Sequence, residues 1–158
     1  MKRLEAVRSH PIFQREYGQL WAAEADRKFC RHSMEHLLDV ARILYILGLE
    51  DGVDLPKEVL YAAALLHDVG RQEQRMVGTP REVAGARLAG EILRDCGFSE
   101  TETAAIQQAI LSHRKTGAED WLCRSLYRAD KASRACYACP AAADCNWPPE
   151  KKNLQIAY

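Results

Sequence analysis

One stretch sets the fold class of this chain: Lys57-Glu58-Val59-Leu60-Tyr61-Ala62-Ala63-Ala64-Leu65-Leu66-His67-Asp68-Val69-Gly70. Its alanines and leucines favour a helix, and glycine is a residue that ends helices. His67 continues the apolar positions Val59 and Ala63, and Asp68 follows it directly. The pattern therefore predicts a helix from Lys57 to about Asp68 that carries an imidazole and a carboxylate towards the core.

Helical spacing extends upstream of this stretch. Apolar residues recur at helical intervals from Phe29 to Leu47, and Gly48 stops the run. The N-terminal 28 residues resemble one more helix. We therefore predict one helix in each of these two regions.

Capping signals define the next helix downstream. Thr79 as N-cap, Pro80 at the first helical position and Glu82 together match a capping box. The helix that they open is predicted to run to about Cys96, where Gly97 stops it.

A second capping box and a further apolar stripe complete the helical pattern. Ser99 and Glu102 open a helix to about His113, and a last helix spans roughly Glu119 to Arg134. Nowhere do β-branched and polar residues alternate over the length of a strand. We expect an all-α, compact single-domain bundle of about five to six helices with a cysteine-rich C-terminal tail.

Length and charge limit the class of protein. The chain has 158 residues with 22 Lys+Arg against 22 Asp+Glu, so it fits one domain and lacks the basic excess of nucleic-acid and membrane-surface proteins. We expect an N-terminal helical segment (1–28) packed on the main helical domain (29–134), and a tail (135–158) that belongs to the same domain. No signal peptide or apolar run of about 20 residues is visible, so we expect a cytoplasmic protein with neither a membrane nor a nucleic-acid partner.

Titratable side chains lie on the apolar stripes of the predicted helices. His36, His113 and Asp130 each continue the stripe of their helix, as His67 and Asp68 do. An unpaired buried carboxylate costs roughly several kcal/mol, so the two aspartates need a cation beside them. Three imidazoles and two carboxylates offer nitrogen and oxygen ligands that suit Mn, Fe, Co, Ni or Zn. The sequence therefore predicts a divalent transition metal in the core.

Three segments carry a resemblance to a known family: Glu35-His36-Leu37-Leu38-Asp39, Leu65-Leu66-His67-Asp68-Val69-Gly70-Arg71 and Ala129-Asp130-Lys131. In this order they resemble the HD superfamily of metal-dependent phosphohydrolases. The resemblance implies an all-helical fold and a site for one or two metals over residues 29–134. It also implies that His36, His67, Asp68 and Asp130 are metal ligands and that His113 lies near the same centre.

The chain departs from the family pattern in one respect. Two-metal members usually carry a further histidine near the start of the third helix, and no histidine stands between His67 and His113. Glu82 offers an oxygen ligand there, although helix capping is the simpler role, so we expect one ion in this site. His32 precedes His36 by one turn, a spacing that can bind metal. Its place near a helix start predicts exposure, and it stays an additional candidate.

The implied reaction is hydrolysis of a small phosphorylated metabolite, with nucleotides as the first choice. A bound cation lowers the pKa of a coordinated water from about 15.7 towards roughly 7, and Asp68 would orient or deprotonate that water. Arg71 and Lys131 are the best-placed groups for binding phosphate, and His113 joins them as a catalytic candidate. Two basic residues, Arg114 and Lys115, are candidates for the rim. The alternative is a non-catalytic HD domain that holds a metal and senses or binds a ligand.

The tail carries a second group of candidate ligands. Cys136, Cys139 and Cys145 form a C-x2-C-x5-C run, and Cys123 lies upstream. The run resembles the end of the iron–sulfur loop of the endonuclease III family, although Ala129 stands where that loop has a further cysteine. Four thiolates can hold zinc or an iron–sulfur cluster; inert packing thiols and a redox pair are the alternatives. Two other cysteines, Cys30 and Cys96, are expected to pack between helices.

Overall fold

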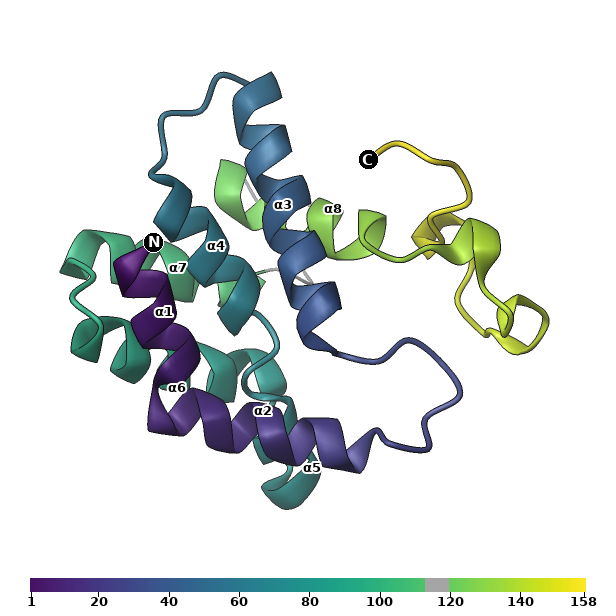
Figure 1. Ribbon diagram of the computed structural model, residues 1–158, viewed down its shortest axis with the longest axis horizontal. Helices are drawn as coiled ribbons and strands as arrows, with labels where there is room; N and C mark the ends of the chain where they lie inside the picture. Colours follow the sequence, from purple (N-terminus) through teal and green to yellow (C-terminus); the bar gives the residue numbers. More distant parts are fainter. Residues whose placement is uncertain (113–119) are drawn as a thin grey trace.

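The computed structural model describes residues 1–112 and 120–158. Within these ranges the chain forms eight α-helices and no strand, which confirms the all-α prediction (Figure 1). The helices are α1 (Lys2–Ser9), α2 (Pro11–Ala23), α3 (Met34–Glu50), α4 (Lys57–Leu66), α5 (Arg71–Val77), α6 (Arg81–Asp95), α7 (Glu100–Ser112) and α8 (Trp121–Ala132). Three short 3-10 helices follow in the tail: η1 (Cys136–Ala138), η2 (Ala142–Asp144) and η3 (Pro149–Lys151).

The described helices outnumber the expected five to six for two reasons. The predicted N-terminal helix divides at His10, whose backbone is extended (ψ 134°). A residue before proline disfavours the helical conformation, whereas Pro11 is well suited to the first position of α2. The chain also forms the short helix α5 directly after Gly70, where the sequence predicted the end of a helix.

Two predicted helix starts are wrong. α3 begins at Met34 rather than near Phe29, because Ser33 Oγ caps it by accepting a hydrogen bond from the His36 N–H at 3.3 Å. Residues 24–33 form a loop instead. α6 begins at Arg81 after Pro80, whose backbone is extended (ψ 128°) and which takes the N-cap position predicted for Thr79.

The capping box of α7 is confirmed. The Ser99 N–H donates to Glu102 Oε2 at 2.8 Å, and the Glu102 N–H donates to Ser99 Oγ at 3.2 Å. These reciprocal bonds give acceptors to two backbone N–H groups that have no partner within the helix.

The core is built mainly from the apolar faces of α3, α4, α6, α7 and α8, and α1 and α2 add Leu4, Val7 and Phe13. α4 contacts α3 and α7, α3 packs along α8, and α6 packs along α7. α1 lies against α4, while α2 contacts α5 and α6 (Figure 1). This arrangement brings the start of α3, the end of α4 and the end of α8 together. No helix in the described ranges is both long and apolar enough to cross a bilayer.

The C-terminal tail, residues 135–158, stands to one side of the helical body (Figure 1). The side-chain amide of Asn153 donates to the Ala132 carbonyl at 2.8 Å, which fixes the tail to the end of α8. The Lys28 ammonium pairs with Asp144 at 2.6 Å, which joins the tail to the loop between α2 and α3.

Candidate metal centre

The candidate centre lies where α3, the end of α4 and α8 meet. His36, His67 and Asp68 are buried, and their ligand atoms lie within 4.8 Å of one another, a spacing that can hold one metal ion. Asp130 comes from α8: its Oδ1 is 3.5 Å from His36 Nε2 and 3.8 Å from His67 Nε2. The structure thus brings together the four residues that the sequence proposed as ligands.

Hydrogen bonds orient the two imidazoles of this group. The Nδ1–H of His67 donates to the Ala64 carbonyl at 2.6 Å. His36 Nδ1 lies 3.0 Å from the hydroxyl oxygen of Ser133, which in turn donates to the Asp130 carbonyl at 2.8 Å. Because Nδ1 is held in both rings, Nε2 faces the centre in each, the arrangement in which metal-binding histidines are commonly fixed.

His32 is buried at 4% exposure, so its predicted exposure is wrong. Its Nδ1–H donates to Glu24 Oε1 at 2.8 Å, and the same carboxylate accepts the His32 backbone N–H at 2.8 Å. His32 Nε2 lies 3.5 Å from Asp68 Oδ2. The buried Glu24 therefore draws the loop inward and aims a third imidazole at the centre. Sequence reasoning missed Glu24, because nothing near it in the chain marks it as an inward carboxylate.

Cationic side chains surround the ligands. Arg71 Nε lies 2.8 Å from Asp68 Oδ1, and Lys131 Nζ lies 2.7 Å from Asp130 Oδ2, so both predicted phosphate-binding residues stand beside a carboxylate. Arg134 places Nη2 2.8 Å from His36 Nε2 and donates through Nη1 to the Arg31 carbonyl at 2.6 Å. Arg134 was not predicted, although it follows Asp130 by four residues and so continues the same stripe.

The electrostatics favour neutral imidazoles at His32 and His36 beside ionised carboxylates. Burial, reinforced by Arg134, lowers the pKa of His36 to about 2. Burial likewise lowers the pKa of His32 to about 4, against the attraction of Asp68. Burial disfavours the charged form of Asp68, but His67 and Arg71 outweigh it and hold the pKa of that carboxyl well below its usual range. Neutral imidazole and ionised carboxylate are the forms that bind metals.

The pKa of His67 indicates that the electrostatic potential at the centre is negative. Against the effect of burial, the carboxylates of Asp68 and Asp130 raise its pKa above the ordinary value. A site that draws a proton onto a fully buried imidazole also attracts a metal cation. Together with the mixed nitrogen and oxygen donors, this potential fits a divalent transition metal.

The remaining predicted residues do not join the centre in the described part of the chain. Glu82 is absent from the group of ligand atoms, and Arg81 beside it approaches Asp68 instead, with Nη1 4.0 Å from Oδ1. Three residues, His113, Arg114 and Lys115, lie outside the described residues.

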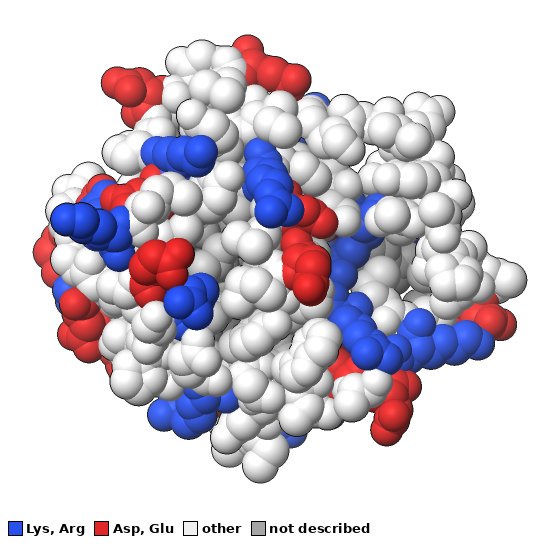
Figure 2. Space-filling view, viewed as in Figure 1, with Lys and Arg blue, Asp and Glu red and all other residues white. Residues whose placement is uncertain are grey.

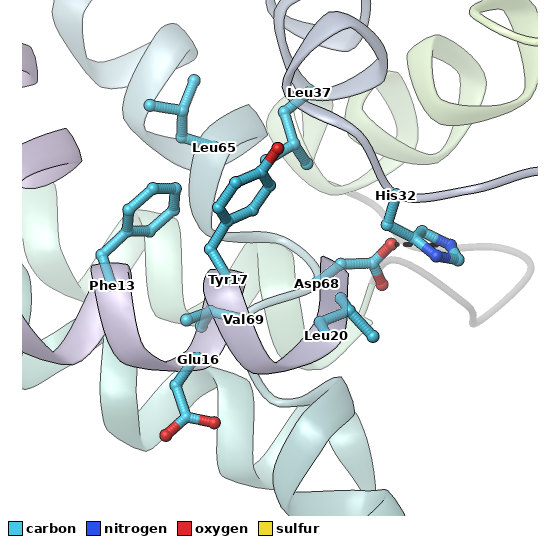
Figure 3. A pocket seen from close by; sticks show the side chains of 9 residues that line it. All are labelled: Phe13, Glu16, Tyr17, Leu20, His32, Leu37, Leu65, Asp68 and Val69. Carbon is cyan, nitrogen blue, oxygen red and sulfur yellow. Dashed lines mark ion pairs between the residues drawn. The ribbon is translucent and has the colours of Figure 1, made fainter. Parts of the chain in front are cut away.

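A small cavity of about 20 Å³ borders the centre. Figure 3 shows His32 and Asp68 facing each other at its edge, with the apolar side chains of Phe13 and Leu20 from α2 forming part of its wall. Its volume suits a single water molecule and no larger ligand.

A wider groove of about 300 Å³ lies on the other side of Lys131. It is lined by Tyr127, Arg128, Lys131, Ala132, Glu150, Lys151, Lys152 and Asn153. Its size falls at the lower end of the range of small-molecule sites, and four of its side chains are basic. Figure 2 shows acidic and basic side chains mixed over one face of the molecule, with basic ones gathered near the hollow between body and tail.

The structure groups a different fourth cysteine with Cys136, Cys139 and Cys145 from the one that the sequence suggested. Cys123 is buried in the helical core on α8. Cys30, from the loop before α3, instead lines a pocket together with Cys136, Cys139 and Cys145.

Comparisons with known proteins agree with this geometry. The HD domain family matches residues 34–139, about two thirds of the chain, from the start of α3 into the tail. A protein of Clostridium beijerinckii, described as uncharacterized, is 44% identical over 135 residues, which cover 85% of this chain and 85% of that protein. No solved structure matches the chain significantly. The chain therefore belongs to the HD domain family.

Proposed function

We propose that this protein is a metal-dependent phosphohydrolase acting on a small phosphorylated metabolite, with nucleotides as the first substrate class. One observation carries the proposal: His32, His36 and His67 each place Nε2 within 3.5 Å of the buried carboxylate of Asp68 or Asp130. Cationic side chains surround this group. Members of the HD superfamily are generally hydrolases, which agrees with this arrangement.

The proposed ligands of one divalent cation are His36, His67, Asp68 and Asp130. When bound, such a cation supplies Lewis-acid charge and a water of lowered pKa. Asp68 borders the water-sized cavity, so its carboxylate is placed to orient a water and accept its proton. His32 lies across that cavity with its Nδ1 fixed by Glu24, which leaves Nε2 to hold the same water.

The proposed phosphate-binding groups are Arg71 and Lys131. Each stands beside one carboxylate of the centre and offers further N–H donors, which phosphate oxygens accept. Lys131 also lines the basic groove of about 300 Å³. A phosphate held by Lys131 at the centre therefore leaves the rest of the substrate in a groove containing Tyr127, Arg128 and Lys152.

The test combines metal analysis with a substrate panel. Purified protein loaded with Mn²⁺ is assayed for phosphate release from nucleoside mono-, di- and triphosphates and from p-nitrophenyl phosphate. We expect release that requires metal and that Asp68→Asn lowers by at least about 100-fold, since both a ligand and a proton acceptor are lost. The matched control is Asp39→Asn, an exposed aspartate on α3 whose partner is Arg42, which should keep full activity.

The test also addresses the alternative of a metal-holding sensor domain. The cations beside both carboxylates would stabilise such a centre without any reaction. Full metal occupancy with no release from any ester overturns the hydrolase proposal and supports the sensor. Activity that survives Asp68→Asn overturns the assignment of this centre as the active site.

A further inference from the structure

A second cluster of candidate ligands lies outside the HD centre. Four of the six cysteines line one cavity of about 80 Å³: Cys30, Cys136, Cys139 and Cys145. Cys30 belongs to the loop between α2 and α3, more than 100 residues before the other three. The fold therefore brings a distant cysteine to the C-x2-C-x5-C run of the tail, as the fourth member of the set.

The local turns explain how the tail presents its sulfurs. Each of the 3-10 helices η1 and η2 is followed by a cysteine, whose backbone N–H donates to the carbonyl three residues earlier: Cys139 to Cys136, and Cys145 to Ala142, both at 3.3 Å. Four of the seven residues between these three cysteines are alanines. The tail contains only short 3-10 helices and neither an α-helix nor a strand.

The state of the four thiols argues against a disulfide framework. All six cysteines of the chain lie in described residues, and all are free. Four reduced thiols around one cavity form a soft sulfur ligand set. Such sets select zinc or iron–sulfur clusters over hard cations.

The spacing favours a cluster over a single ion. Zinc–sulfur bonds of about 2.3 Å put the four sulfurs of a tetrahedral site about 3.8 Å apart. Within the described ranges, the group of side chains with the spacing of a single ion is His36, His67 and Asp68, and the cysteines are not part of it. Their sulfurs are instead spread around a cavity large enough to hold several atoms.

The lining of the cavity suits a cluster held by thiolates. Apolar side chains of Phe29, Trp147 and Leu154 line it beside the four cysteines, which are half-buried. Lys152 also lines it and donates through Nζ to the Cys145 carbonyl at 3.2 Å. Its positive charge offsets the charge of coordinated thiolates, as hydrogen bonds and nearby charges do in iron–sulfur sites.

We propose that Cys30, Cys136, Cys139 and Cys145 bind a [4Fe–4S] cluster. Coordination releases the four thiol protons, and each thiolate binds one iron. The cluster ties the loop between α2 and α3 to the tail. Cys30 is two residues from His32, and Cys136 is two residues from Arg134. The cluster would therefore also help to keep His32 and Arg134 in place at the HD centre.

The test measures iron, acid-labile sulfide and visible absorption on full-length protein purified without oxygen and reconstituted with iron and sulfide. We expect about four irons and four sulfides per chain from the cluster and a brown chromophore. Sulfide and colour separate this site from the HD centre, which can take iron but not sulfide. Cys30→Ala should lose both signals, whereas Cys96→Ser and Cys123→Ala should keep them, with circular dichroism confirming helical folding of each variant.

Three outcomes overturn the proposal. One zinc per chain without colour, lost in Cys30→Ala but kept in Asp68→Asn, would show that the thiols hold a single ion. Absence of sulfide after reconstitution of the wild-type chain would show that the thiols bind no cluster, whatever the variants do. Sulfide retained in Cys30→Ala but lost in Cys123→Ala would move the fourth ligand to the helical core. None of these results bears on whether the HD centre hydrolyses phosphate esters.

Discussion

At the scale of single residues, Ser133 decides which nitrogen of His36 faces the candidate metal centre. Its hydroxyl donates to the Asp130 carbonyl, so its oxygen is left to accept the Nδ1–H of His36. Ser133→Ala removes this acceptor, and the ring is then free to rotate or change tautomer. We expect a loss of about 10-fold in Mn²⁺ affinity, as is common when the partner of a metal-binding histidine is removed.

Titration of Mn²⁺ by calorimetry checks this prediction. Ser133→Thr keeps the hydroxyl and serves as the matched control, with affinity close to that of the wild-type chain. Equal affinities for the alanine and threonine variants would show that the hydroxyl does not orient His36.

Gly70 is a second residue on which the centre depends, because it allows the chain after Asp68 to pass close to α6. A Cβ at this position would overlap the carbonyl oxygen of Arg81 and the backbone nitrogen of Gly85. Neither backbone can move without displacing α6. We expect Gly70→Ala to lower the free energy of unfolding by roughly 1–3 kcal/mol, the usual cost of overpacking, and to weaken metal binding.

Urea denaturation measures this loss. The control is Gly18→Ala in α2, where an added Cβ meets nothing within 4 Å. That change should raise stability by about 0.5–1 kcal/mol, since alanine favours a helix over glycine. A Gly70→Ala protein as stable as the wild type would contradict the close approach of the two segments.

Residues close together in the chain were predictable, and residues joined across the chain were not. His67 and Asp68 are adjacent, and their placement on an apolar stripe is enough to carry them inward. Arg134 and His36 are 98 residues apart, so no local sequence pattern predicts their contact. The same holds for Cys30, which local spacing assigns to packing and which the fold places with the tail cysteines.

At the scale of elements, local signals gave the helices but misplaced some of their ends. The capping box of α7 depends on residues three apart, so the sequence predicts it fully. The sequence predicted that the helix begins near Phe29, but residues 24–33 form a loop, in which Glu24 accepts the His32 N–H and Ser33 caps α3. Side-chain contacts within this stretch of sequence therefore stabilise a loop there.

Arg3 joins three elements and provides a test at this scale. On α1, it pairs with Glu58 of α4 and with Glu102 of α7, each at 2.8 Å, and its guanidinium lies 4.2 Å from the centre of the Phe98 ring. Exposed pairs contribute less than about 1 kcal/mol each, and a cation–π contact adds a similar amount. We expect Arg3→Ala to lower the free energy of unfolding by roughly 1–2 kcal/mol at pH 7.

The same network predicts how stability depends on pH. The hydrogen bond from Arg3 lowers the pKa of Glu102 below its model-compound value of 4.5. A carboxyl with a depressed folded-state pKa contributes stability above its unfolded-state pKa, and this contribution is lost as the pH falls through the folded-state value. Glu102→Gln should therefore cost stability at pH 7 and cost progressively less below pH 4.5.

Urea denaturation of the wild-type and Glu102→Gln chains between pH 7 and pH 3 checks this sign. A difference between the two proteins that grows as the pH falls would contradict the network, because it would mean that protonated Glu102 is the stabilising form.

At the scale of the whole molecule, the HD centre gathers groups from widely separated parts of the chain. His32 precedes α3, His36 lies on α3, Asp68 follows α4 and Asp130 lies on α8. An unfolded chain cannot hold these groups together, so an ion that binds them binds the folded state. Binding of the proposed metal would therefore be coupled to folding stability, and its removal would lower the melting temperature.

The coupling can be estimated. A ligand at 100 times its dissociation constant stabilises the folded state by about 2.7 kcal/mol. For a chain of 158 residues, that corresponds to a rise in Tm of roughly 5–10 °C. We expect this rise when Mn²⁺ is added to chelator-treated protein, and no rise for Asp68→Asn. Mn²⁺ is the ion of choice because it prefers oxygen and nitrogen over thiolate ligands, so the tail cysteines do not contribute. A Tm that rises equally in Asp68→Asn would place the stabilising ion elsewhere in the molecule.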